Sequence, residues 1–251
     1  MRIGVRGHDY GTTTATELAR RISEAGFSCL QLALHKAIEG VQPEYGRLNP
    51  GFCYDVRRAF EDRHLEVAVL GCYIDPASLD EEKRLYDVKR FREQVAYCRQ
   101  LGSNIVATET SSYQGDEAGR EAQFARLTDS VLRMVEQAER FGVFVGIEPV
   151  HVHTLNTPAL TRRLLDIVAC DNMQIVLDPI NLLSPQTIDR QREIIDECLA
   201  LFGDRIVAIH AKDVQIGENG RFRPCVIGDG LFDHEYFYGK LAKVKPDISV
   251  L

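Results

Sequence analysis

The chain has 251 residues, a length that suits one large α/β domain or two small ones. Hydrophobic residues make up 45% and charged residues 27%, an ordinary composition for a soluble globular protein. Its formal net charge of −7, without a basic block, argues against nucleic acid or an anionic membrane surface as a partner. Its apolar runs fall short of the roughly 20 residues that span a bilayer. The seven cysteines form no Cys-x-x-Cys pair, so we expect free thiols and a cytoplasmic location.

Short apolar runs alternate with longer amphipathic stretches along the whole chain. The runs predict buried parallel strands at Arg2–Val5, Phe27–Leu32, Glu66–Leu70, Asn104–Ala107, Val143–Ile147, Gln174–Leu177, Arg205–Ile209 and Asp247–Leu251. The amphipathic stretches predict helices, each followed by a capping glycine, at Thr14–Ala25, Leu85–Leu101, Glu121–Phe141 and Thr187–Phe202.

This alternation favours a single α/β domain over residues 1–251, folded as a (β/α)8 or TIM barrel. A doubly wound open sheet is the alternative, and it is weakened because no Gly-x-Gly-x-x-Gly follows the first strand. The eighth predicted strand coincides with the end of the chain, whereas a complete barrel would add a final helix. We therefore expect a barrel truncated at its eighth strand, with a native C-terminal tail missing from the sequence.

Three metal-binding residue types come directly after predicted strands. Glu148, Asp178 and His210 lie one βα unit apart, so they should meet on adjacent strands at the carboxyl-terminal mouth of the barrel. Two neighbouring carboxylates repel each other unless a cation neutralises them. With an imidazole, they suit a divalent ion such as Mn²⁺, Zn²⁺, Mg²⁺ or Co²⁺. Each residue alone has a simpler explanation, as a loop, turn or structural residue, but their common phase favours a metal site.

Other polar residues follow the predicted strands or lie in the loops of the mouth. We predict substrate contacts for His8, His35, Glu109, His153, Asn181 and Arg223. A solvated loop position is the alternative for most of these residues. Asp213 is expected either to support the His210 imidazole or to occupy a plain turn. Cys72 and Tyr73 are expected to form an apolar wall or to pack as ordinary core residues.

The sequence resembles the xylose-isomerase-like TIM-barrel superfamily, a group of sugar-phosphate isomerases and epimerases, inosose dehydratases and relatives of endonuclease IV. The similar segments are Ile-Glu-Pro at 147–149, Leu-Asp-Pro-Ile-Asn at 177–181, Ile-His-Ala-Lys-Asp at 209–213 and Ile-Gly-Asp-Gly-Leu-Phe-Asp at 227–233. The resemblance implies that Glu148, Asp178 and His210 bind the metal together with a second glutamate, which would follow Leu251. Asn181 departs from the histidine that many epimerases carry at this position.

The resemblance also implies a function. We expect a metal-dependent isomerase or epimerase acting by proton transfer on a small-molecule sugar, sugar-like polyol or cyclitol, with Glu148 as acid or base. Related proteins often form homo-oligomers. An inosose-type dehydratase and a non-catalytic ligand-binding barrel are the alternatives. A nuclease of the AP-endonuclease type is disfavoured, because it needs a histidine-rich multi-zinc site and a basic DNA face.

Overall fold

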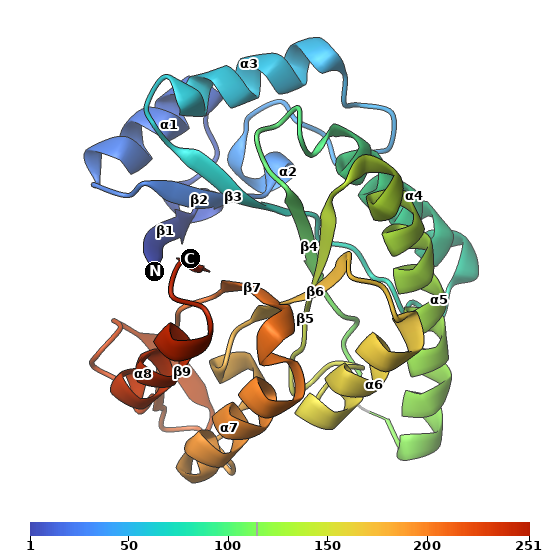
Figure 1. Cartoon of the computed structure of the whole chain (residues 1–251), viewed down its shortest axis with the longest axis vertical. Helices are drawn as coiled ribbons and strands as arrows, with labels where there is room; N and C mark the ends of the chain where they lie inside the picture. The colour runs from blue at the N-terminus through green and yellow to red at the C-terminus, as the bar shows by residue number, and fades with distance from the viewer. Residues whose placement is uncertain (114) are drawn as a thin grey trace.

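Eight parallel strands close into a barrel in the computed structural model, which describes residues 1–113 and 115–251. The strands are β1 (Arg2–Arg6), β2 (Cys29–Leu32), β3 (Glu66–Gly71), β4 (Ile105–Glu109), β5 (Phe144–Glu148), β6 (Met173–Leu177), β7 (Ile206–Ile209) and β10 (Ser249–Val250). They follow one another around the barrel in chain order (Figure 1). The predicted (β/α)8 fold is therefore confirmed.

The two-residue strand β10 closes the barrel between the first strand and the seventh. Ser249 pairs with Arg2 on β1 and with Ala208 on β7. Beyond the strand, the Leu251 amide donates to the Ile209 carbonyl over 2.8 Å. The expected eighth strand is thus present, and it joins both of its neighbours.

Helices surround the barrel and cover the outward faces of its strands (Figure 1). They are α1 (Ala15–Glu24), α2 (Leu34–Ala37), α3 (Pro50–Glu61), α4 (Glu81–Tyr97), α5 (Glu117–Phe141), α6 (Pro158–Val168), α7 (Gln191–Phe202) and α8 (His234–Val244). The short α2 and the longer α3, α6 and α8 are not among the helices predicted from the sequence. Within the described part of the chain, no helix is both long and apolar enough to cross a membrane.

Capping side chains explain where several of these helices begin. Asn49 and Thr157 each accept a backbone N–H from the first turn of α3 and α6, and each is followed by a proline at the first helical position. Asp233 caps α8 in the same way. The caps of α4 and α5, Asp80 and Asp116, start those helices four residues earlier than predicted.

A glycine follows each of the four predicted helices, although α4 already ends at Tyr97, with Cys98 as its C-cap, five residues before Gly102. Gly26, Gly102 and Gly142 have positive φ angles of 85°, 82° and 62°, which only glycine adopts without strain. Gly203 differs, because its φ of −57° is helical and the chain continues into a 3₁₀ turn over Gly203–Arg205. Gly203 is still the C-cap of α7, as predicted, but it lacks the left-handed geometry of the other glycines.

The core has two parts. Large side chains fill the layer between strands and helices, and Phe60, Phe91 and Phe202 are almost fully buried there. A smaller cluster packs inside the barrel and consists of Cys29, Ala68, Val69, Ala107, Val176, Ala208 and Leu251. Mostly small side chains fill this interior, so the barrel is packed and is not a pore.

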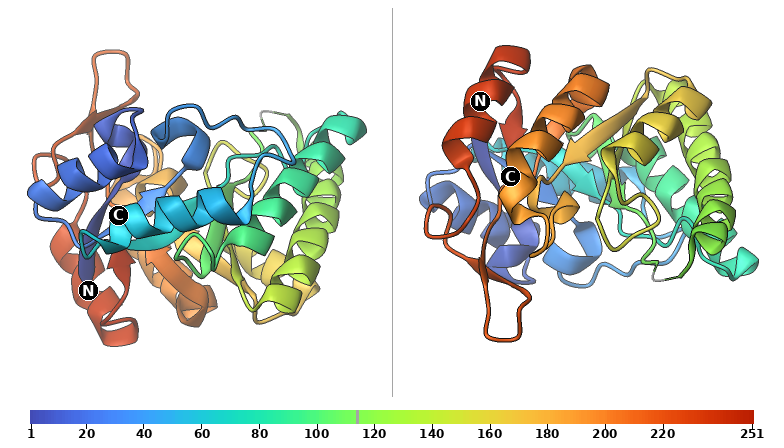
Figure 2. Two further views of the ribbon diagram at one scale, coloured as in Figure 1. Left: turned by 90° about the horizontal axis from the view of Figure 1, so that it is seen from above. Right: turned by 90° about the horizontal axis from the view of Figure 1, so that it is seen from below.

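An antiparallel hairpin interrupts the repeat after β7. Its strands are β8 (Asp213–Ile216) and β9 (Phe222–Cys225), and they pair with each other in register. The hairpin stands out from the barrel in both side views (Figure 2). This hairpin was not among the elements predicted from the sequence.

Candidate metal centre

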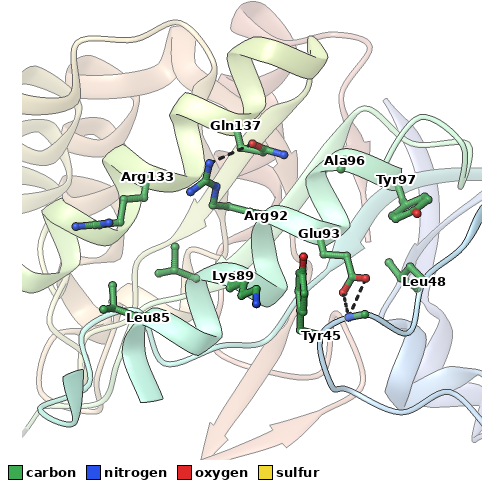
Figure 3. A pocket seen from close by; sticks show the side chains of 12 residues that line it. Tyr45, Leu48, Leu85, Lys89, Arg92, Glu93, Ala96, Tyr97, Arg133 and Gln137 are labelled. Atoms are coloured by element: carbon green, nitrogen blue, oxygen red, sulfur yellow. Dashed lines mark hydrogen bonds between the residues drawn. The ribbon is translucent and has the colours of Figure 1, made fainter. Parts of the chain in front are cut away.

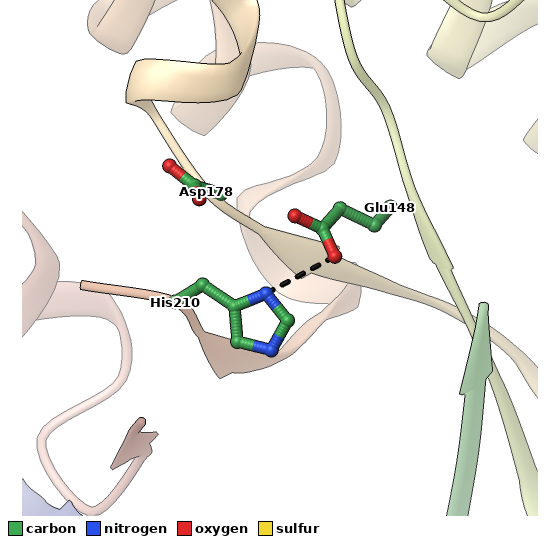
Figure 4. Close-up of side chains that lie close together, drawn as sticks. All are labelled: Glu148, Asp178 and His210. Atoms are coloured by element: carbon green, nitrogen blue, oxygen red, sulfur yellow. Dashed lines mark ion pairs between the residues drawn. The ribbon is translucent and has the colours of Figure 1, made fainter. Parts of the chain in front are cut away.

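Glu148, Asp178 and His210 meet at the carboxyl ends of three adjacent strands. Glu148 is the last residue of β5, and the other two follow β6 and β7 directly. One ligand atom from each residue lies within 4.8 Å of the others (Figure 4). The three residues are only 4%, 0% and 6% exposed. The structure thus brings together the triplet that the βα phase predicts.

Both oxygens of the Glu148 carboxylate have nitrogen partners. Oε2 lies 3.0 Å from His210 Nδ1, and Oε1 accepts a 2.6 Å hydrogen bond from Asn181 Nδ2. Burial raises the pKa of Glu148, but the charge and hydrogen bond of His210 outweigh burial and hold that pKa below its usual value. Glu148 is therefore kept ionised.

Asp178 is paired with a cation from the same chain. Its Oδ2 lies 2.6 Å from Lys212 Nζ, and its Oδ1 accepts the Asn181 backbone N–H over 3.2 Å. Lys212 also donates to the Asn181 side-chain oxygen over 3.0 Å. Burial raises the pKa of Asp178 despite this lysine, and the charge of Glu148 adds to the rise. Lys212 was not among the site residues predicted from the sequence.

The His210 ring is held on both of its nitrogens. Nδ1 faces Glu148, while Nε2 contacts the side-chain oxygen of Gln31 on β2. Burial lowers the pKa of His210, but the neighbouring carboxylate of Glu148 outweighs burial and the pKa is raised. Gln31 was missed, although it is the one amide within the apolar run of the second predicted strand.

This donor set fits a divalent cation. Two carboxylates and an imidazole face one another in a site nearly closed to solvent, and such oxygen and nitrogen donors suit a hard or borderline ion. The ammonium of Lys212 already offsets the charge of Asp178, which shows that the cluster needs positive charge. The Glu-Asp-His cluster could therefore bind a metal.

Several other predicted residues lie at the same mouth. Glu109 ends β4 directly opposite Glu148, and both burial and the charge of Glu148 raise its pKa. His8 follows β1 with its ring edge-on to Tyr73, at a centroid distance of 6.2 Å. His153 lies in the loop after β5, where the charge of Glu148 raises its pKa less than burial lowers it. Burial lowers the pKa of both histidines.

Two predicted substrate residues lie elsewhere. His35 is on α2 and lines a small hollow with Pro43 and Arg90. Arg223 is on the exposed strand β9, where its guanidinium donates to the Gln215 side chain over 2.7 Å. The projecting hairpin, which the sequence did not reveal, carries Arg223 away from the cluster.

Asp213 holds a loop instead of supporting His210. Its carboxylate accepts backbone N–H groups from Gly228 and Gly230 over 2.9 and 3.0 Å, and also contacts His234 Nε2 at 3.0 Å. A Cβ on Gly230 would lie 1.9 Å from an Asp213 oxygen, so glycine is required there. This explains the Gly-Asp-Gly sequence at 228–230 as a structural element of the mouth.

An open hollow of about 700 Å³ lies on the outer surface, against α4 and α5 (Figure 3). Its arginines already have partners, since Arg92 donates to Gln137 over 3.3 Å and Arg133 to Asp129 over 2.9 Å. The hollow is therefore a poor anion site.

The chain belongs to the xylose isomerase-like TIM-barrel family, whose model matches residues 19–251. Comparison with curated proteins gives no match. Among solved structures, an IolI protein with a bound zinc atom is 17% identical with a TM-score of 0.75, covering 100% of this chain and 87% of that one.

Two further solved structures are similar to the same degree. A 3-keto-D-glucoside 4-epimerase from E. coli is 18% identical with a TM-score of 0.75, covering 100% of this chain and 90% of that one. A D-tagatose 3-epimerase-like protein is 19% identical with a TM-score of 0.76, covering 100% and 89%. At these identities the likeness establishes the fold.

Proposed function

We propose that the protein is a metal-dependent isomerase or epimerase acting on a sugar or sugar-like polyol. The convergence of Glu148, Asp178 and His210 at the barrel mouth carries this proposal. The family, and the sugar epimerases among its structural neighbours, support the substrate class.

Glu148, Asp178 and His210 would hold the ion. When bound, a divalent ion polarises a substrate carbonyl and acidifies the adjacent C–H bond. The near-complete burial of the three residues shields their side chains from water, which strengthens electrostatic interactions among them.

Glu148 is the proposed base. Its carboxylate is ionised and fixed by Asn181 and His210, so one oxygen can accept a proton from substrate carbon and return it. Glu109 is paired with Glu148 across β4 and β5, and burial and the charge of Glu148 raise its pKa, so its carboxyl group is placed to form a hydrogen bond with a substrate hydroxyl. The lowered pKa values of His8 and His153 keep both imidazoles neutral, able to donate and accept hydrogen bonds with hydroxyls.

Metal analysis of the purified protein tests the site. We expect about one ion per chain in the wild type and almost none in Asp178→Ala. The matched control is Asp189→Ala, which removes an exposed aspartate and should keep the ion. Absence of metal from the wild type after incubation with Mn²⁺, Zn²⁺, Mg²⁺ and Co²⁺ would overturn the proposal.

A substrate screen in D₂O tests the reaction. Ketohexoses, ketopentoses and inososes would be incubated with the metal-loaded protein, and deuterium incorporation next to the carbonyl would be followed by NMR. Isomerisation or epimerisation by proton transfer predicts exchange at that carbon and a new sugar. Loss of water would instead indicate a dehydratase. If none of the tested compounds took up deuterium, the protein would be a non-catalytic binding barrel.

A further inference from the structure

Gln31 is a buried amide in an otherwise apolar strand. Within β2 it lies between Leu30 and Leu32, and it is 2% exposed. Because side chains alternate along a strand, the two leucines pack in the outer core while Gln31 shares the inward face with Cys29. A buried amide costs free energy unless its groups are hydrogen-bonded, so this position calls for partners.

Both ends of the Gln31 amide have partners. Its oxygen contacts His210 Nε2, and its nitrogen donates to Tyr73 Oη over 3.1 Å. Tyr73 is fixed in turn, since the Lys36 ammonium lies 3.6 Å from its ring centroid. Burial raises the pKa of Tyr73 to about 12, so its hydroxyl stays neutral and can accept this bond. The amide is thereby fixed between a phenol and the imidazole.

The neighbouring strand leaves room for this amide. A Cβ on Gly71, at the end of β3, would lie 3.0 Å from Gln31 Nε2 and 3.4 Å from the Ala33 Cβ. The φ of Gly71 is not in the left-handed region that demands glycine, so close packing is the reason for glycine here. Glycine at position 71 therefore leaves the space that the Gln31 side chain occupies.

We propose that Gln31 is a positioning residue for the metal centre: its oxygen accepts the Nε2–H of His210 and holds Nδ1 toward Glu148 and Asp178. Histidine binds a metal through an unprotonated nitrogen, and the hydrogen bond at its other nitrogen selects the tautomer. A neutral amide does this without adding a third negative charge beside two carboxylates. The inference rests on the proposed metal site.

The test compares two buried glutamines of the barrel strands. Gln31→Met keeps the size of the side chain and removes the acceptor, and we expect Zn²⁺ affinity to fall about 10–100-fold. Gln174→Met is the control, because Gln174 on β6 is also buried but donates to the Asp171 carbonyl over 2.7 Å. Its affinity should match that of the wild type. Kd would be measured by competition with a chromophoric chelator at fixed pH.

Two further variants separate positioning from general packing. Gln31→Glu retains an oxygen acceptor and should restore most of the affinity lost in Gln31→Met. Tyr73→Phe removes one hydroxyl from the far end of the amide and should lower affinity less. The visible spectrum of bound Co²⁺ reports ligand geometry, and it should change in Gln31→Met and Tyr73→Phe but not in Gln174→Met.

The outcomes distinguish this inference from the function on which it rests. A wild type that binds no metal overturns the proposed function itself. A wild type that binds metal, with unchanged affinity and Co²⁺ spectrum in both Gln31→Met and Tyr73→Phe, overturns only the role of Gln31. If Gln31→Met does not fold, Tyr73→Phe decides the question by the same two measurements.

Discussion

Asn181 connects the two carboxylates of the centre. Its side-chain nitrogen donates to Glu148, and its side-chain oxygen accepts from Lys212, which also pairs with Asp178. Removing one member of such a buried network leaves another charge poorly paired, which costs more than the lost hydrogen bond alone. Asn181 therefore acts on the base without being one itself.

We predict that Asn181→Ala lowers kcat about 10–100-fold, because Glu148 loses the donor that fixes one of its oxygens. Steady-state kinetics on the sugar identified by the screen would measure the effect. Arg223→Ala is the matched control and should leave kcat and KM unchanged, since Arg223 lies on the hairpin. An equal loss in Arg223→Ala would show that the hairpin closes over the site.

The sequence could predict the candidate metal ligands but not the residues that hold those ligands in position. Glu148, Asp178 and His210 were predictable because each follows an apolar run at the same phase of the repeat. Gln31 supports His210 from 179 residues away, across a contact between β2 and β7 that no local pattern encodes. The sequence offered one indication of the role of Gln31, which is that a glutamine interrupts an apolar strand.

The loop at 226–233 depends on one carboxylate. Burial raises the pKa of Asp213, but hydrogen bonds from His234 and from the backbone amides of Gly228, Phe232 and Val214 outweigh burial and hold that pKa below its ordinary value of 3.8. The folded state therefore favours ionised Asp213. This contribution to stability is present above the unfolded pKa and is lost as the pH falls through the lower, folded pKa.

We predict that Asp213→Asn lowers the free energy of unfolding by about 1–3 kcal/mol at pH 7, because the loop loses a charged acceptor. Urea denaturation at several pH values would measure it. The difference from the wild type should be constant above the ordinary value and shrink as the pH falls below 3.8. A difference that grows on acidification would contradict the assigned direction of the pKa.

Among the elements, the barrel strands were easier to predict from the sequence than the helices and the hairpin between them. All eight barrel strands overlap their predicted runs, because parallel strands buried on both faces are continuously apolar. The hairpin of β8 and β9 lacks that signature, since it is largely exposed and its turn lies in a polar segment. Helices α3 and α6 were not predicted, although each begins with a capping residue followed by a proline.

Two helix-terminal glycines provide a matched test of backbone geometry. Gly142→Ala should destabilise the protein by about 1 kcal/mol, because the φ of Gly142 is 62°. Gly203→Ala should stabilise it by about 0.5 kcal/mol, because φ is helical and the new Cβ meets Val244 at an ordinary 3.6 Å. Chemical denaturation of both variants measures the two signs. Equal destabilisation would show that packing at position 203 outweighs backbone entropy.

At the scale of the whole molecule, three strands contribute the candidate ligands and a fourth, β2, supports them. Ion binding should therefore stabilise the entire barrel, since the folded arrangement alone brings these residues together. At a free concentration near 100 Kd, the gain is about 2.7 kcal/mol.

For a chain of this size, we expect that gain to raise Tm by about 5–10 °C. Scanning calorimetry with and without a chelator measures the shift, at equal protein concentration. Asp178→Ala should show no shift. A shift of the same size in Asp178→Ala would place the stabilising ion at some other group of acids.

The strand β10 has a consequence for folding kinetics. Its hydrogen bonds join residues at the two extremes of the sequence, as in the contact between Arg2 and Ser249, which are 247 positions apart. The entropy lost in closing a loop grows with the length of that loop, and pairings between distant segments are slow to form. Neighbouring βα units, by contrast, can associate along the chain as each forms. We therefore expect the seam between β1 and β10 to be the last part of the barrel to assemble.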